Sequence, residues 1–255
     1  MRFDVITLFP ELFAPFLASG VTRRAYASGQ VDVRLWNPRE HAEGNYRRVD
    51  DRPFGGGPGM VMLAEPLGRC LEAIRQARAE GAAEQAPLVL FSPIGQRLDH
   101  AGVQGLSDSR GAILLCGRYE GIDQRFIDRH VDAQISLGDF VLSGGEIAAM
   151  ALLDAVARLQ PGVLHDAGSH QLDSFNPELD GLLDCPHYTR PEVWQGQGVP
   201  APLLSGHHAQ IERWRREQRL ATTLRHRPDL LAAARARGQI TREDEAFLAK
   251  DGSLL

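Results

Sequence analysis

The chain has 255 residues, of which 43% are hydrophobic and 24% are charged, which is typical of a folded protein of one or two domains. The formal net charge of −5 excludes a strongly basic protein, although arginines that cluster on one surface could still bind RNA. No run approaches the roughly 18 apolar residues of a membrane helix, and the N-terminus lacks the layout of a signal peptide, so we expect a cytoplasmic protein without a membrane partner.

Apolar runs rich in β-branched residues alternate with segments of helical period along the first two thirds of the chain. We predict strands at residues 3–7, 31–36, 88–92, 112–116 and 134–137. We predict helices at residues 10–17, 65–79, 124–130 and 146–159, the last ended by Gln160, Pro161 and Gly162. This alternation favours an α/β fold with a mainly parallel sheet, in a domain of residues 1–162.

The pattern changes after Gly162. Residues 163–176 are polar and have no apolar period, so we predict a flexible linker or lid there. For residues 177–255 we predict a small, mostly helical second domain, with long helices near residues 208–224 and 229–236.

The cysteines and histidines do not form a readable metal or disulfide pattern. Cys70, Cys116 and Cys185 are far apart and odd in number, so we expect reduced, mostly buried thiols. His207 and His208 are adjacent and cannot share a helix face, and we predict no structural metal.

Nearly every cation of this chain is an arginine, because Lys250 is the one lysine among 28 basic residues. Six arginines gather in one predicted helical segment, at positions 213, 215, 216, 219, 225 and 227. Their planar donors suit phosphate groups, but a solvated helix face explains such a run equally well.

Three loops that contain glycine each follow directly on a predicted strand, at residues 91–95, 116–121 and 137–145. Since ligands of open α/β sheets bind outside the carboxyl ends of the strands, we expect these loops to form one site. Their glycines would let backbone groups approach a purine, although any single glycine could simply make a tight turn. The sequence contains no G-x-x-x-x-G-K-[ST] motif, and no G-x-G-x-x-G follows the first strand, which excludes the common phosphate-binding loops.

Four longer motifs carry a family resemblance. They are DDRPFGGGPGM at residues 50–60, CGRYEGID at 116–123, GDFVLSGGE at 138–146 and LDCPHYTRP at 183–191. In this order they resemble the bacterial tRNA (guanine-N1-)-methyltransferases, the TrmD family of the SPOUT superfamily. The resemblance implies transfer of a methyl group from S-adenosyl-L-methionine to N1 of guanine 37 of tRNA. It further implies a trefoil knot at the C-terminal part of the α/β domain, a homodimer with shared active sites, and dependence on Mg²⁺, for which no carboxylate spacing predicts a site.

The resemblance also assigns residues. The cofactor would be held largely by backbone groups, in a site made of Ser92, Pro93, Gly117, Tyr119, Leu137, Gly138, Asp139, Phe140, Val141, Leu142, Gly144 and Gly145. Glu120 and Arg158 would position cofactor and guanine, and Asp173 matches the general base of the family. The chain departs from many relatives at Leu90, Ile135 and Phe140, which leaves the packing of the adenine open.

The reaction itself requires these residue types, independently of the family resemblance. As guanine N1 attacks the methyl group, a base must remove its proton and a donor must stabilise charge on O6, and a carboxylate and an arginine suit those tasks. Other roles remain open at this stage. Arg158 could complete the last turn of a helix, Asp173 could belong to a cap with Ser174 and Asn176, and Glu120 could pair with Arg118 or Arg125.

Two further alternatives concern the base and the function class. His165 and His170 compete with Asp173, since an imidazole is the commonest base at neutral pH. A non-catalytic RNA-binding module that has kept the fold is the alternative to an enzyme, and it would have no need of a carboxylate at Asp173.

Overall fold

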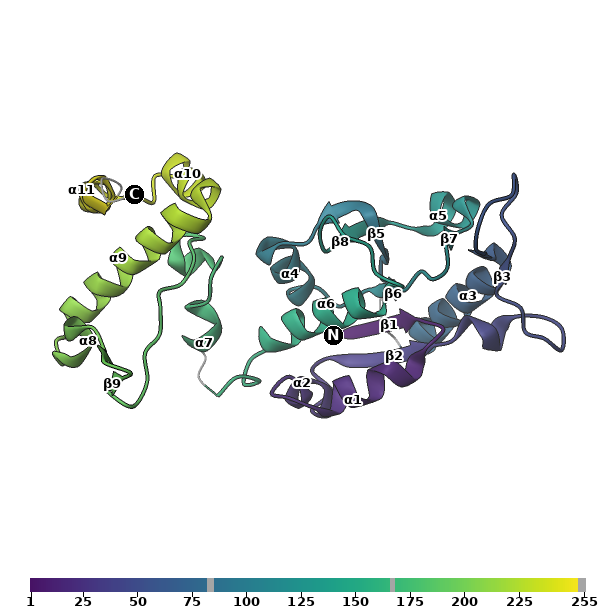
Figure 1. The fold of residues 1–255 in the computed structure, drawn as a ribbon. Coiled ribbons are helices and arrows are strands. Elements are labelled where there is room, and N and C mark those ends of the chain that lie inside the picture. Colours follow the sequence, from purple (N-terminus) through teal and green to yellow (C-terminus); the bar gives the residue numbers. More distant parts are fainter. Residues whose placement is uncertain (82–84, 166–167, 252–255) are drawn as a thin grey trace. The chain divides into compact units, whose positions relative to one another are not determined.

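The computed structural model describes residues 1–81, 85–165 and 168–251, in two compact units that comprise Met1–His165 and Asp166–Leu255 (Figure 1). Residues 166–167 of the predicted linker and residues 252–255 of the predicted second domain lie outside the described residues. A short helix, α7 (Gly168–Gln171), occupies part of the segment predicted as a linker.

The first unit is built on a five-stranded sheet. Its spatial order is β2 (Asp32–Trp36), β1 (Arg2–Ile6), β6 (Ile113–Leu115), β5 (Leu88–Arg97) and β8 (Ala133–Ser136). Every pairing between these strands is parallel. The five strands predicted from the sequence are these five, and the predicted α/β class with a mainly parallel sheet is confirmed.

Helices cover both faces of this sheet because successive side chains of a buried strand point to opposite sides. Along β1, Phe3 and Val5 join one apolar core while Ile6 joins the other. The first core includes side chains from α1 (Phe13–Ala18), α2 (Arg23–Ala27), α4 (His100–Ser107) and α6 (Glu146–Arg158), and the second from α3 (Ala64–Glu80) and α5 (Gln124–His130). Figure 1 shows this arrangement of helices around the sheet in the first unit.

The predicted helices are present, and most of the elements that were not predicted are short. A 3-10 turn, η1 (Pro10–Leu12), precedes α1, so the predicted helix at residues 10–17 is two elements. The sequence pattern did not predict α2, α4 with its two glycines, the 3-10 helix η2 (Pro38–His41) or the ten-residue helix α11 (Arg242–Asp251). It also missed a small sheet of β3 (Asp50–Asp51), β4 (Val61–Met62) and β7 (Gly121–Ile122), whose two-residue strands are too short to show a period.

The second unit is mostly helical. It contains η3 (Pro177–Leu179), the hairpin strands β9 (Val193–Trp194) and β10 (Gln197–Gly198), and the helices α8 (Ala201–Leu204), α9 (His208–His226), α10 (Pro228–Ala236) and α11 (Arg242–Asp251). Its core consists of Leu182, Leu220, Leu231, Ala234 and Leu248. Within the described ranges, no helix is long and apolar enough to cross a membrane.

The three cysteines are free and buried, as predicted. Burial is the main reason that the pKa of the Cys70 thiol rises to about 12, so this thiol is uncharged at neutral pH.

A buried charge cluster lies on β1. The carboxylate of Asp4, whose side chain is fully buried, accepts hydrogen bonds from Arg2 Nη2 at 2.8 Å and from Arg78 Nη1 at 2.6 Å. The indole of Trp36 donates a further hydrogen bond of 2.9 Å to the same carboxylate. This carboxylate therefore compensates two guanidinium groups that are themselves withdrawn from water.

We expect Asp4→Ala to lower the free energy of unfolding by about 3–5 kcal/mol, because it leaves buried positive charge without its counter-ion. Asp32→Ala is the matched control, since it breaks the exposed Arg34–Asp32 pair and should cost less than about 1 kcal/mol. Urea unfolding followed by circular dichroism measures both variants. Equal losses in the two would show that the Asp4 cluster contributes no more than a surface pair.

Candidate functional site

A cavity of about 280 Å³ lies at the carboxyl ends of β6 and β8 and beside an interruption within β5. Residues from all three of the glycine-containing loops border it, so loops that are far apart in the sequence meet at one edge of the sheet. Its volume is near the lower end of the range of small-molecule sites.

The first border is made by an interruption in β5. Phe91 and Gln96 both pair with Ile135 of β8, so residues 92–95 loop out between them and bring Ser92 and Pro93 to the cavity. A Cβ on Gly95 would lie 2.5 Å from the backbone nitrogen of Ile135. Glycine is therefore required where this loop returns to the sheet.

The loop after β6 carries Gly117, Tyr119 and Glu120. Tyr119 has a φ of 61°, in the left-handed region that costs a non-glycine residue free energy. Its phenol accepts a hydrogen bond from Arg39 at 3.4 Å. Partial burial raises the pKa of the phenol, the neighbouring carboxylate of Asp50 raises it further, and the charge of Arg39 opposes these effects. This loop is thus held in a strained conformation by contacts with η2 and β3.

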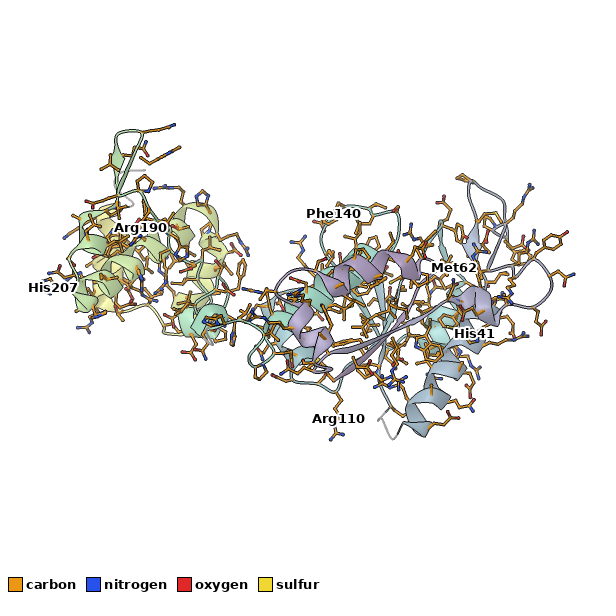
Figure 2. The ribbon with its side chains drawn as sticks, turned by 90° about the horizontal axis from the view of Figure 1, so that it is seen from below. His41, Met62, Arg110, Phe140, Arg190 and His207 are labelled. Carbon is orange, nitrogen blue, oxygen red and sulfur yellow. The ribbon has the colours of Figure 1, made fainter. Side chains whose placement is uncertain are left out.

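The loop after β8 supplies the third border. Gly138 has a φ of 150°, and the ring of Phe140, which is 56% exposed, packs near it. Figure 2 shows Phe140 on a loop that projects from the first unit. At the end of the loop, Gly145 N donates a hydrogen bond of 3.0 Å to Gly117 O, which joins two of the loops directly.

The small sheet brings the glycine-rich segment of residues 55–60 to the rim. β4 pairs with β7, and Glu120 N donates a hydrogen bond of 2.9 Å to Met60 O. Gly59 lies against Glu120, because a Cβ there would be 2.5 Å from Glu120 Cγ. The first and second sequence motifs are therefore neighbours in the structure.

Eleven of the twelve residues expected to hold the cofactor border this cavity, namely Ser92, Pro93, Gly117, Tyr119, Leu137, Gly138, Phe140, Val141, Leu142, Gly144 and Gly145. Asp139 does not border it; its side chain is 93% exposed and forms a 2.9 Å ion pair with Arg97.

Glu120 also borders the cavity. The alternative that it pairs with Arg118 or Arg125 is wrong, because these arginines pair with Glu146 and Asp123. Within the described part of the chain, no ion pair of Glu120 is present, which leaves its carboxylate available to a ligand.

Arg158 and Asp173 do not border the cavity. Arg158 is the last residue of α6, where a cation also interacts favourably with the helix dipole. Asp173 belongs to the second unit, in a turn where its carbonyl accepts a hydrogen bond from Asn176 N. The cap of η3 is Asn176, whose side chain accepts a hydrogen bond from Glu178 N; Asn176 is one member of the capping cluster considered for Asp173.

Sequence reasoning missed part of the cavity wall. The residues not assigned to the site include the apolar side chains of Leu90, Phe91, Ile122, Ile127, Ile135 and Ala148, together with Arg118 and Ser143. The resemblance could have indicated Leu90 and Ile135, which had been noted for the packing of the adenine, whereas Ile127 and Ala148 lie on α5 and α6, outside the motifs. The six apolar side chains share the lining of the cavity with the loops.

One group of potential metal ligands is present among the described residues. Single ligand atoms of Asp184, Cys185 and His187 lie within 4.8 Å of one another in the second unit. The Asp184 carboxylate already pairs with His187 at 2.9 Å and with Arg219 at 3.4 Å, so its oxygens have partners within the protein.

Comparison with known proteins identifies relatives over the whole chain. The family model described as tRNA (Guanine-1)-methyltransferase TrmD matches residues 1–233. A protein named tRNA (guanine-N(1)-)-methyltransferase from Paracidovorax citrulli is 78% identical over 255 residues, covering 100% of both chains. Proteins of the same name from Polaromonas sp. and Bordetella pertussis are 76% and 57% identical, each covering 98% of this chain and 96% and 97% of their own.

We expect Gly145→Ala to lower the free energy of unfolding by about 1–3 kcal/mol, because overpacking at this site cannot relax easily. The added Cβ would lie 2.7 Å from Cys116 Cα, a backbone atom. Gly105→Ala in α4 is the control, since nothing lies within 4 Å of its Cβ and alanine favours a helix by up to about 1 kcal/mol. If thermal unfolding showed Gly145→Ala to be as stable as Gly105→Ala, the close contact between these loops would not exist in solution.

Proposed function

This chain belongs to the tRNA (guanine-1)-methyltransferase family, and we propose that it transfers a methyl group from S-adenosyl-L-methionine to N1 of guanine 37 of tRNA. The observation that carries this proposal is the cavity at the carboxyl ends of β6 and β8 and at the interruption of β5, bordered by the three loops that contain glycine. Two of those loops contain motifs typical of the family.

The donor set of the cavity suits S-adenosyl-L-methionine. Leu90, Ile122 and Ile135 offer an apolar surface for an adenine ring, and the backbone of the loops after β6 and β8 offers N–H and C=O groups for its edge and for the ribose. The carboxylate of Glu120 complements the positive charge of a sulfonium or an ammonium group. When bound, the cofactor supplies the electrophilic methyl group.

The catalytic roles follow from the chemistry of guanine. In this proposal Asp173 accepts the N1 proton, the guanidinium of Arg158 stabilises charge that develops on O6, and Glu120 orients the reacting groups. The side chain of Asp173 is half-buried, and its turn is held by hydrogen bonds from Asp173 N to His170 O and from Asn176 N to Asp173 O. These bonds hold the backbone that carries the carboxylate, which favours a defined geometry toward a substrate.

The trefoil knot, the obligate homodimer with shared sites, the dependence on Mg²⁺ and the cytoplasmic location belong to the same proposal. An exposed apolar surface supports the dimer. Ile147 and Ala151 lie one turn apart on the exposed face of α6, close in sequence to the exposed Val141 at the cavity. Burial of this face against a second copy of the chain would remove it from water.

A single assay tests the reaction. The protein is incubated with unmodified tRNA and S-adenosyl-L-methionine, and the methylated nucleoside and its position are identified by mass spectrometry. We expect 1-methylguanosine at position 37. Binding of tRNA without methylation would instead support a non-catalytic RNA-binding module.

We expect Asp173→Ala to lower kcat by about a hundredfold or more, while the affinity for S-adenosyl-L-methionine, measured by calorimetry, stays unchanged. The reason is that the carboxylate would act on the guanine and not on the cofactor. His170→Ala, three residues away, is the control and should retain nearly full activity. The opposite pattern, an active Asp173→Ala and an inactive His170→Ala, would make the histidine the base.

Mixing two inactive variants tests the shared sites. A dimer of Asp173→Ala with Gly117→Trp would keep one complete site, made of one subunit's cavity and the other subunit's carboxylate. Random exchange of subunits should then restore about a quarter of the wild-type rate. A monomeric mass in solution with full activity would exclude this arrangement.

Most of the six arginines from Arg213 to Arg227 already have carboxylate partners, which limits the number available to bind tRNA phosphates. Five of them form ion pairs within the second unit: Arg213 with Glu217 and Glu243, Arg215 with Glu212, Arg216 with Asp180 and Asp244, Arg219 with Asp184, and Arg227 with Asp229. Arg219 is only 8% exposed, so it serves the fold. The exposed Arg225 has no ion-pair partner within the described ranges, and its guanidinium is available to a phosphate.

We expect Arg225→Gln to reduce the slope of log Kd for tRNA against log salt by about one, because one phosphate contact with its released counter-ion would be lost. Arg129→Gln, on the exposed side of α5, is the matched control and should leave the slope unchanged. Filter binding between about 50 and 200 mM salt gives both slopes. An unaltered slope in Arg225→Gln would remove this part of α9 from the tRNA-binding surface.

A further inference from the structure

An ion pair between a partly exposed arginine and a buried glutamate lies at the cavity. Glu146, the first residue of α6, is 1% exposed, and its Oε2 lies 2.9 Å from Arg118 Nε. Its other oxygen, Oε1, accepts a hydrogen bond of 2.9 Å from the hydroxyl of Thr7, just beyond the end of β1. Its place at a helix N-terminus also favours the negative charge.

The arginine of this pair connects two of the cavity's loops. Arg118 follows Gly117 in the loop after β6, and its Nη1 donates a hydrogen bond of 3.2 Å to Ser143 O in the loop after β8. Its guanidinium carbon lies 4.4 Å from the centre of the Phe9 ring, which packs on the guanidinium from the side of β1. Arg118 and Ser143 both border the cavity.

Gly144 gives an independent indication that this contact governs the local structure. A Cβ at this position would lie 2.5 Å from Arg118 Cδ and 2.6 Å from Glu146 Oε2. The backbone of Gly144 is not in the left-handed region, so an L-residue could adopt its conformation. A glycine is therefore needed at this position because the ion pair fills the space that a side chain would take.

Stability alone does not account for such a pair, because apolar replacements of buried ion pairs are often neutral or stabilising. The nearby carboxylate does fix the position of the guanidinium by charge, and the guanidinium then fixes its acceptor, Ser143 O. We propose that Arg118 and Glu146 are positioning residues that set the spacing between the loops after β6 and β8, and so shape the cavity for the methionine and adenosine portions of S-adenosyl-L-methionine. This inference rests on the proposed function for the identity of the ligand.

A double-mutant cycle tests it, with the variants Arg118→Gln, Glu146→Gln and the two combined. Calorimetry measures the Kd for S-adenosyl-L-methionine, and thermal unfolding measures stability. Each single variant should be less stable, because it leaves a buried charge uncompensated, and should raise the Kd by about tenfold or more. The double variant should regain stability without regaining affinity, since the link to Ser143 is still absent.

A recovery of affinity together with stability in the double variant would overturn the proposal, because the pair would then be structural only. Gly144→Ala should also raise the Kd by about tenfold. Two controls isolate the effect: Asp4→Asn weakens a comparable buried ion cluster away from the cavity, and Gly105→Ala adds a methyl group in open space. Both should leave the Kd unchanged.

Hydrogen exchange without cofactor separates this inference from the proposed function. Amides of residues 137–145 should exchange faster in both single variants, in the double variant and in Gly144→Ala, but not in the controls. If the wild-type chain did not bind S-adenosyl-L-methionine, the proposed function would fail, while unchanged exchange in the variants would overturn the positioning role.

Discussion

All five strands of the main sheet run in the same direction, and the site depends on this constraint. Parallel strands need long crossover connections, so helices cover both faces and leave the edge at the carboxyl ends open. The ends of β6 and β8 and the interruption within β5 meet at that edge, and each of the three provides a loop that contains glycine. Segments separated by up to about fifty residues of sequence therefore form one cavity without any large rearrangement of the fold.

The cavity is shaped by backbone approaching backbone. At Gly95 and Gly145 a side chain would collide with main-chain atoms of Ile135 and Cys116. At Gly144 it would instead collide with the ion pair of Arg118 and Glu146. The three glycines are the same residue type, but each makes room for a different contact. Replacing one of them should therefore affect stability or cofactor binding differently from replacing another.

Charge is distributed unequally around the site. Arg118 is neutralised by Glu146 at the cavity, whereas Glu120 at its border forms no ion pair within the described residues. A cationic ligand would accordingly meet an available carboxylate. In the second unit, most arginines from Arg213 to Arg227 pair with carboxylates of that unit. Arg225 is exposed and has no ion pair in the described part of the chain.

From sequence alone, hydrophobic periodicity determined the five strands, the α/β class and the long helices, because these elements are long enough for the burial of alternate or every third to fourth side chain to show. The motifs at residues 116–123 and 138–146 also located most of the cavity border. Only the tertiary structure decided the ion-pair partners of the arginines, the two-residue strands around Asp50, and the place of Ile127 and Ala148 in the cavity lining. The reason is physical: an ion pair such as Arg118 with Glu146 or a contact such as Gly145 with Cys116 joins residues about thirty positions apart, and neither its existence nor its distance is encoded in any local period.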